Sequence, residues 1–158
     1  MTSAPKRHVT WADVERMVGQ LLATLPRGYD SLLVITRGGM VPACLISERT
    51  NIRNILCAAV VLYEDDERTL PEPVFVQFPE ERHVTGRRIL VVDDVWDSGS
   101  TIVAVRDRLR KAGAHVQTCV LHYKPGRSRY PGDGPDFHAE TTDAWIVYPW
   151  DAANRLPE

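Results

Sequence analysis

The sequence predicts an α/β fold in which a mainly parallel, twisted sheet is flanked by helices on both faces. Short runs rich in β-branched apolar residues alternate along the chain with segments of helical periodicity. Several of these runs end abruptly at a glycine-bearing or acidic loop, as strands of open α/β sheets do before a helix. The length of 158 residues suits one domain spanning residues 1–158.

The first elements form a helix and then a βαβ unit. Thr10 and Asp13 resemble a helix start, and apolar residues then recur at helical spacing until Pro26. A buried strand is predicted at residues 31–36, a helix at 41–49 and a second strand at 55–63.

The next elements repeat the order of strand, loop and helix. Residues 64–85 contain an acidic cluster and several prolines, with strand-like alternation at residues 74–78, which predicts a long loop or a short hairpin. A strand at residues 88–92, a helix at 100–111 and a strand at 116–123 follow, and a last short strand is predicted at 144–148.

The composition bounds the class of protein. An apolar fraction of 44%, a charged fraction of 25% and a net charge of −2 describe a soluble globular protein without the basic excess of a nucleic-acid binder. No apolar run approaches the roughly 18 to 20 residues that cross a bilayer, and no signal peptide is recognisable. We therefore expect a cytoplasmic protein that has no transmembrane segment and binds no nucleic acid.

The cysteines and histidines indicate no metal or disulfide framework. Cys44, Cys57 and Cys119 each lie among apolar neighbours, so we expect three buried free thiols. The five histidines show no metal-ligand spacing and have no cysteine pair beside them.

Chemistry-bearing residues concentrate in the loop after the strand at 88–92. Asp93 and Asp94 are adjacent carboxylates, Asp97 is a third, and residues 98–101, Ser-Gly-Ser-Thr, open a helix. Amides at a helix start bind phosphate, while carboxylates before it suit vicinal hydroxyls or a divalent cation, so a sugar phosphate explains both halves. The same residue types are also ordinary turn and capping residues, and composition alone does not separate the two interpretations.

The full string VVDDVWDSGST at residues 91–101 resembles the phosphoribosyl-diphosphate-binding signature of the type I phosphoribosyltransferases. Three further segments, HVTWADVERMVGQLLATL, LLVITRGGMVPACLISERTNIRNI and TDAWIVYPWD, are similar to the bacterial xanthine-guanine phosphoribosyltransferases and related 6-oxopurine enzymes. The similarity covers most of the chain and is weakest at residues 64–85 and 127–137.

The resemblance implies the type I phosphoribosyltransferase fold, with a flexible hood loop at residues 64–85 and a small C-terminal base-binding portion. It also implies binding roles for phosphoribosyl diphosphate. Arg37, Gly38 and Gly39 would bind its pyrophosphate, with a cis peptide expected at Arg37–Gly38. Asp93 and Asp94 would bind the ribose hydroxyls and contact Mg²⁺, which arrives mainly with the substrate. The loop formed by Ser98, Gly99, Ser100 and Thr101 would hold the 5-phosphate.

The resemblance places a purine base beside this sugar site. Asp97 would act as general base or acid near N7, and Lys124 would donate to the 6-oxo group. Trp145 would stack on the ring, and the backbone carbonyl of Ile146 would read the 2-position. The implied reaction joins guanine, xanthine or hypoxanthine to the phosphoribosyl group in purine salvage.

Some features depart from the family or leave alternatives open. The hood region matches loosely, with Arg68 a candidate pyrophosphate ligand, and Trp96 is bulkier than the pattern suggests. A sensor of phosphoribosyl diphosphate on the same fold, or an enzyme for adenine or a pyrimidine, are the competing hypotheses. The family is commonly dimeric or tetrameric, so a homodimer or homotetramer is expected.

Overall fold

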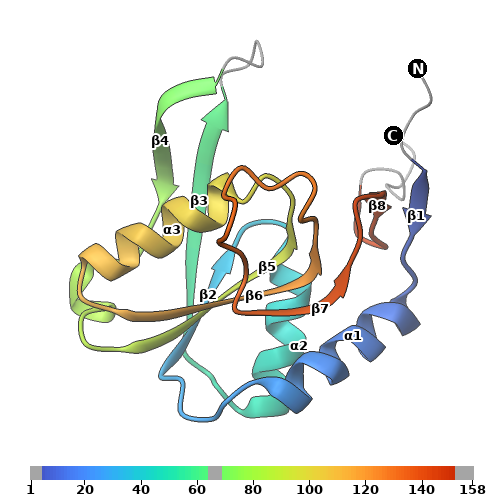
Figure 1. Ribbon diagram of the computed structural model, residues 1–158. Coiled ribbons are helices and arrows are strands. Elements are labelled where there is room, and N and C mark those ends of the chain that lie inside the picture. The colour runs from blue at the N-terminus through green and yellow to red at the C-terminus, as the bar shows by residue number, and fades with distance from the viewer. Residues whose placement is uncertain (1–4, 64–68, 152–158) are drawn as a thin grey trace, which may run out of the picture.

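A computed structural model describes residues 5–63 and 69–151 of the chain, and its centre is a six-stranded sheet (Figure 1). The strand order is β4-β3-β2-β5-β6-β7, and each neighbouring pair is parallel except β3 with β4. The sheet strands are β2 (Ser31–Ile35), β3 (Ile55–Tyr63), β4 (Thr69–Gln77), β5 (Arg88–Trp96), β6 (His115–Tyr123) and β7 (Phe137–Thr141). The predicted mainly parallel sheet is confirmed.

Three helices cover the two faces of this sheet, as predicted. They are α1 (Trp11–Thr24), α2 (Met40–Thr50) and α3 (Ser100–Lys111), with a short 3₁₀ turn at Glu81–His83. Helix α1 begins at the expected cap, where the Thr10 side chain accepts from the Asp13 amide and the Asp13 carboxylate accepts from the Thr10 amide.

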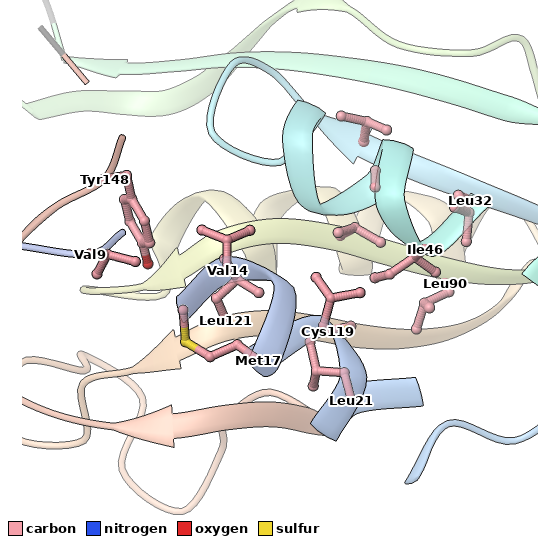
Figure 2. Packing of buried hydrophobic residues seen from close by; sticks show 14 of the residues in the cluster. Val9, Val14, Met17, Leu21, Leu32, Ile46, Leu90, Cys119, Leu121 and Tyr148 are labelled. Carbon is pink, nitrogen blue, oxygen red and sulfur yellow. The ribbon is translucent and has the colours of Figure 1, made fainter. Parts of the chain in front are cut away.

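Alternate side chains of the strands divide the core into two layers. Leu32, Leu90 and Leu121 pack with α1 and α2, and Figure 2 shows them beside Val14, Met17 and Ile46. Leu33 and Val91 point to the opposite face and pack with residues of α3. Strands β2, β5 and β6 are therefore buried on both sides, which explains their apolar runs at residues 32–35, 89–92 and 119–121.

The region predicted as a loop or short hairpin contains a long antiparallel arm. Strands β3 and β4 extend together away from the rest of the sheet (Figure 1). At the base of this arm the Arg108 guanidinium of α3 lies 4.3 Å from the ring centroid of Phe75 and 4.2 Å from that of Phe78. These cation–π contacts join the arm to α3.

Two strands and the environments of two cysteine thiols were not predicted. Strand β1 (Lys6–His8) forms a separate two-stranded parallel sheet with β8 (Trp145–Val147), and β7 adds an edge strand next to β6. Cys119 is buried as expected, whereas Cys57 is only half-buried. Cys44 is exposed, because it lies on the side of α2 that faces away from the core. Within the described ranges, no helix is long and apolar enough to span a membrane.

Candidate active site

The carboxyl ends of β2, β5 and β6 bring three loops to one edge of the sheet. The strands are aligned in register, with Val34 opposite Val92 and Val92 opposite Cys119. A pocket of about 750 Å³ opens at this edge. Its wall includes five residues predicted from the sequence, namely Arg37, Gly38, Asp94, Trp145 and Ile146. Open α/β sheets bind ligands at this position.

The turn after β2 brings backbone close to the carboxylates of β5. Gly38 has no room for a side chain, because a Cβ there would lie 2.5 Å from the Asp94 carboxylate. Gly39 precedes α2 and donates its amide to the Ile35 carbonyl at 2.9 Å. The cis peptide joins Thr36 to Arg37, one residue before the predicted position, since the turn starts directly after β2 ends at Ile35.

Asp93 and Asp94 form a carboxylate pair inside the last part of β5. The Asp94 amide donates to Asp93 Oδ1 at 2.9 Å. Burial, followed by the charge of Asp94, raises the pKa of Asp93 well above its usual range. Burial also raises the pKa of Asp94, and the charge of Asp151 adds to this shift. The pair is therefore a place where negative charge is crowded and partly desolvated.

This pair fits a hard divalent cation whose other ligands are mostly water molecules and oxygen atoms of the substrate. Carboxylate oxygens are the ligand type that Mg²⁺ takes from proteins, usually one or two per site. A cation there would favour the ionised forms against the burial, and the like charge, that raise both pKa values. No group of three or more potential ligand side chains occurs among the residues that the structure describes, so an all-protein metal cage is not formed there.

The loop between β5 and α3 has the form of an anion-binding turn. The Ser98 hydroxyl lies 3.2 Å from the Ser100 hydroxyl and accepts from the Ser100 amide at 3.3 Å. Gly99 has a φ of 81° and leads directly into α3, whose first amides have no intrahelical partner. Together with Thr101 in the first turn, these groups can cradle a phosphate.

Trp96 packs against this loop on the α3 side of the sheet. Its side chain is fully buried on the α3 face, and its Nε1 donates to the Ser128 hydroxyl at 3.1 Å. A side chain at Gly99 would collide with the indole. The unusual tryptophan is therefore a packing residue beneath the candidate phosphate loop (residues 98–101), with edge-on contacts to Tyr123 and Tyr130.

Asp97 lies between two cations. Lys124 Nζ donates to Asp97 Oδ2 at 2.9 Å, and Arg127 Nε donates to Asp97 Oδ1 at 2.5 Å. Burial alone would raise the pKa of Asp97, but the hydrogen bonds from Arg127 and Lys124 outweigh it and lower the pKa below its ordinary value. The carboxylate is therefore ionised at neutral pH and can accept a proton or a hydrogen bond.

Strand β8 adds a flat apolar surface beside this cluster. Trp145 is 59% exposed, and Lys124 Nζ lies 5.9 Å from its ring centroid. Lys124 itself is only 4% exposed, which holds its ammonium group between the tryptophan and Asp97. Ile146 is buried next to Trp145. A planar ligand stacked on Trp145 would meet a donor at Lys124.

The structure thus forms two linked clusters from the predicted residues. Arg37, Gly38 and Asp94 meet in the pocket with Trp145 and Ile146, whereas Asp97 and Lys124 meet each other and join the pocket through Trp145. Arg68 lies outside the described residues.

Sequence reasoning did not select several residues at the site. Arg127 contacts Asp97, and the pocket wall also contains Met40, Val41, Trp150 and Asp151. Arg127 follows Lys124 in the loop between β6 and β7, and Trp150-Asp151 ends the segment TDAWIVYPWD that resembles the family. Charge and aromatic character near a predicted ligand are the signals that would have found Arg127, Trp150 and Asp151.

Comparisons with known proteins agree with this geometry. A xanthine-guanine phosphoribosyltransferase of Gluconobacter oxydans is 34% identical over 148 residues, covering 92% of this chain and 84% of that protein. Its counterpart from Idiomarina loihiensis is 33% identical and covers 90% of this chain and 85% of its own length. A crystal structure of a purine phosphoribosyltransferase from Pyrococcus horikoshii superposes with a TM-score of 0.80 at 27% identity, covering 97% of this chain and 99% of that one.

The family model described as the phosphoribosyl transferase domain matches residues 8–153. This range contains the β2 turn, the carboxylate pair, the phosphate loop and strand β8. The chain therefore belongs to the phosphoribosyltransferase family.

Proposed function

We propose that this enzyme transfers the 5-phosphoribosyl group of phosphoribosyl diphosphate to a 6-oxopurine base, namely guanine, xanthine or hypoxanthine. The products are a nucleoside 5′-monophosphate and pyrophosphate, as in purine salvage. The observation that carries the proposal is the Trp145, Lys124 and Asp97 cluster, with 5.9 Å from ring centroid to Nζ and 2.9 Å from Nζ to Oδ2. The similarity to proteins named xanthine-guanine phosphoribosyltransferase supports the same base class.

The sugar half of the proposed site would bind phosphoribosyl diphosphate through three groups. The hydroxyls and amides of residues 98–101 suit the 5-phosphate, and the Asp93–Asp94 pair suits the 2- and 3-hydroxyls as acceptors. Arg37 and the amides of Gly38 and Gly39 suit the pyrophosphate, since a guanidinium and close backbone donors neutralise a leaving anion.

Mg²⁺ is the proposed cofactor, held by Asp93 and Asp94 together with the substrate. Bound there, it would supply charge neutralisation to the pyrophosphate. The raised pKa values of Asp93 and Asp94, caused first by burial, support this assignment because a neighbouring cation favours their ionised forms.

In the base half, Trp145 would stack on the purine, Lys124 would donate to the 6-oxo oxygen, and the Ile146 carbonyl would face the 2-position. Asp97 would take the N7 proton while N9 forms its bond to C1′ and the bond from C1′ to pyrophosphate breaks. The lowered pKa of Asp97, in which hydrogen bonds from Arg127 and Lys124 outweigh burial, keeps the carboxylate ionised at neutral pH, which a proton acceptor requires. Positioning and charge stabilisation of an oxocarbenium-like transition state would supply the rest of the rate.

We also propose that the protein forms a homodimer or homotetramer. The β3–β4 arm exposes an apolar strip formed by Val61, Val74 and Val76, which are 41%, 51% and 70% exposed. Val61 and Val74 are register partners, and Val76 follows Val74 by two residues on the same face of β4. Exposed apolar groups of this kind favour burial against a second copy. Light scattering of wild type and a Val74→Glu/Val76→Glu variant tests this, with a fall to the monomer mass expected for the variant.

A cytoplasmic location and a single-domain organisation complete the proposal. Cys44, Cys57 and Cys119 are all free thiols, which is usual in a reducing compartment.

The decisive experiment measures pyrophosphate release from phosphoribosyl diphosphate and Mg²⁺ with each candidate base. Release with guanine, xanthine or hypoxanthine, and not with adenine or orotate, is the expected result. Release only with adenine or a pyrimidine would overturn the base assignment. Tight binding of phosphoribosyl diphosphate without release for any base would favour the sensor hypothesis.

A further inference from the structure

Arg127 contacts the proposed proton acceptor, although its side chain is 57% exposed. Its Nε donates to Asp97 Oδ1 at 2.5 Å, and this bond raises the pKa of the Arg127 guanidinium. The nearby charge of Asp143 acts in the same direction. Ion pairs of exposed side chains contribute little to folding stability, which leaves a functional role as the more informative interpretation of this contact.

The two oxygens of Asp97 have different partners. Oδ2 accepts from Lys124, whose buried ammonium group lies beside Trp145, whereas Oδ1 accepts from Arg127 in the loop after β6. Neither Lys124 nor Arg127 lines the pocket itself, but Lys124 Nζ lies 5.9 Å from the ring centroid of Trp145, which does. Oδ2 is thus the oxygen linked to the pocket wall.

The loop that carries Arg127 is anchored at several points on both sides. The Ser128 hydroxyl accepts from Trp96 Nε1, and the Arg129 amide donates to the Ser98 carbonyl at 3.0 Å. The Gly126 amide donates to Asp143 Oδ1 at 3.0 Å, next to β8.

Farther along the same loop, Arg106 of α3 holds Asp133 through two hydrogen bonds of 2.9 and 2.7 Å. These contacts fix the loop to the phosphate loop, to β8 and to α3. The backbone from which Arg127 extends therefore has a defined position relative to Asp97.

Building on the proposed function, we propose that Arg127 is a positioning residue for proton transfer. It holds Asp97 Oδ1 while Lys124 leaves Oδ2 and donates to the 6-oxo oxygen of the incoming base. Oδ2 is then free to accept the N7 proton as N9 bonds to C1′ and pyrophosphate departs with the electron pair of the broken bond. Without Arg127, the carboxylate would lose its remaining fixed hydrogen bond when the base displaces Lys124.

Electrostatics support the same role. The charged groups that face Asp97 are Lys124 and Arg127, and Asp143 faces Arg127 in turn. Once Lys124 donates to the base, Arg127 is the cation that still opposes the effect of burial on the Asp97 pKa. Loss of Arg127 would therefore raise the pKa of Asp97 in the complex and leave less of it ionised.

The test compares Arg127→Ala and Arg127→Lys with Arg129→Ala as a matched control. Arg129 is an exposed arginine in the same loop, and none of the described residues forms an ion pair with its side chain. Pyrophosphate release is measured against base concentration, phosphoribosyl diphosphate concentration and pH, and thermal unfolding checks that each variant is folded.

Arg127→Ala is expected to lower kcat by about 10- to 100-fold, which is part of the roughly 10² to 10⁴ that proton transfer contributes. The KM for phosphoribosyl diphosphate should stay unchanged, since Arg127 touches the base half only. The acidic limb of the kcat profile should move to higher pH, because a raised pKa protonates Asp97 earlier as the pH falls. Arg127→Lys should restore part of kcat and move the acidic limb back, while Arg129→Ala should match wild type.

A folded Arg127→Ala with wild-type kcat and an unmoved acidic limb would overturn the positioning role. Equal losses in Arg127→Ala and Arg129→Ala would overturn it as well, because they would indicate a general disturbance of the loop. Both results require an active wild type. A wild type that releases no pyrophosphate with any base contradicts the proposed function itself, so the two failures are distinguishable.

Discussion

The end of β5 and the loop that follows it contain two sets of carboxylates in opposite electrostatic surroundings. Asp93 and Asp94 lie against each other, and burial, followed by like charge, raises the Asp93 pKa. Asp97 follows three residues later, and there two cations outweigh burial, so that its pKa is lowered. Neighbouring titratable groups with divergent pKa values indicate a division of roles. The pair is suited to a cation that arrives with a ligand. The cations beside Asp97, in contrast, are the side chains of Lys124 and Arg127.

Asp97→Asn should remove the proton acceptor and leave the pair intact. Turnover should fall by about 10² to 10⁴, since an amide cannot accept the N7 proton. Binding of phosphoribosyl diphosphate should remain close to that of wild type. Steady-state kinetics and calorimetric titration with phosphoribosyl diphosphate and Mg²⁺ measure the two effects. Unchanged turnover would remove Asp97 from the mechanism.

Asp93→Asn should show the converse pattern. The amide oxygen can still accept from the Asp94 amide, but the cation site loses a charge, so affinity for phosphoribosyl diphosphate with Mg²⁺ should fall about 10- to 100-fold.

The same variant should unfold at a higher temperature in the absence of ligand. A carboxyl whose pKa is raised by folding destabilises the folded state as the pH rises through its unfolded and then its folded pKa. At neutral pH the Asn variant avoids that cost. Calorimetric scans at neutral pH without ligand measure this, and a lower unfolding temperature than wild type would contradict the crowding of charge at the pair.

Trp145→Ala should affect the base half without affecting stability. Loss of stacking costs about 1 to 3 kcal/mol, so the KM for the base should rise at least about fivefold while that for phosphoribosyl diphosphate is unchanged. Because Trp145 is 59% exposed, the free energy of unfolding should change by no more than about 0.5 kcal/mol. Equal changes in both KM values would show that the two halves are not separate.

The smallest expected effect is that of mild acid on wild type. A lowered pKa keeps Asp97 ionised until the pH falls through that value, so base-dependent kcat should be nearly constant from about pH 8 down to about pH 6. A pH series at saturating substrates measures it. A loss of kcat already near neutrality, in a protein that remains folded, would argue against the two-cation environment.

The sequence predicted the strands that are buried on both faces, because their apolar runs follow directly from burial. It did not predict β1 or β7, which are short, contain charged residues and owe their position to distant partners in β8 and β6. Strand β5 was expected to end at Val92, but pairing with β6 continues to Trp96 through the carboxylates that resemble a loop. Local patterns do not contain such long-range pairing.

The direction of the side chains at the end of β5 was also not predictable from the sequence. Val91 faces α3 and Val92 faces α1 and α2, yet Val95 packs on the α1 and α2 side and Trp96 on the α3 side. Strict alternation of side chains along β5 would place Val95 on the α3 side and Trp96 on the α1 and α2 side. Asp93, Asp94, Asp97 and Lys124 could be chosen from their spacing and resemblance, while the contact of Arg127 with Asp97 depends on how a distant loop folds back.

The strand that presents Trp145 takes its hydrogen-bonding partner from the opposite end of the chain. Lys6 is the register partner of Trp145, the Trp145 amide donates to the Pro5 carbonyl, and the Val9 amide donates to the Val147 carbonyl. Changes at residues 5–9 should therefore act on the strand that carries Trp145, more than a hundred positions away in sequence. For protein engineering, this makes residues 5–9 positions at which the proposed base recognition can be changed without touching a pocket residue.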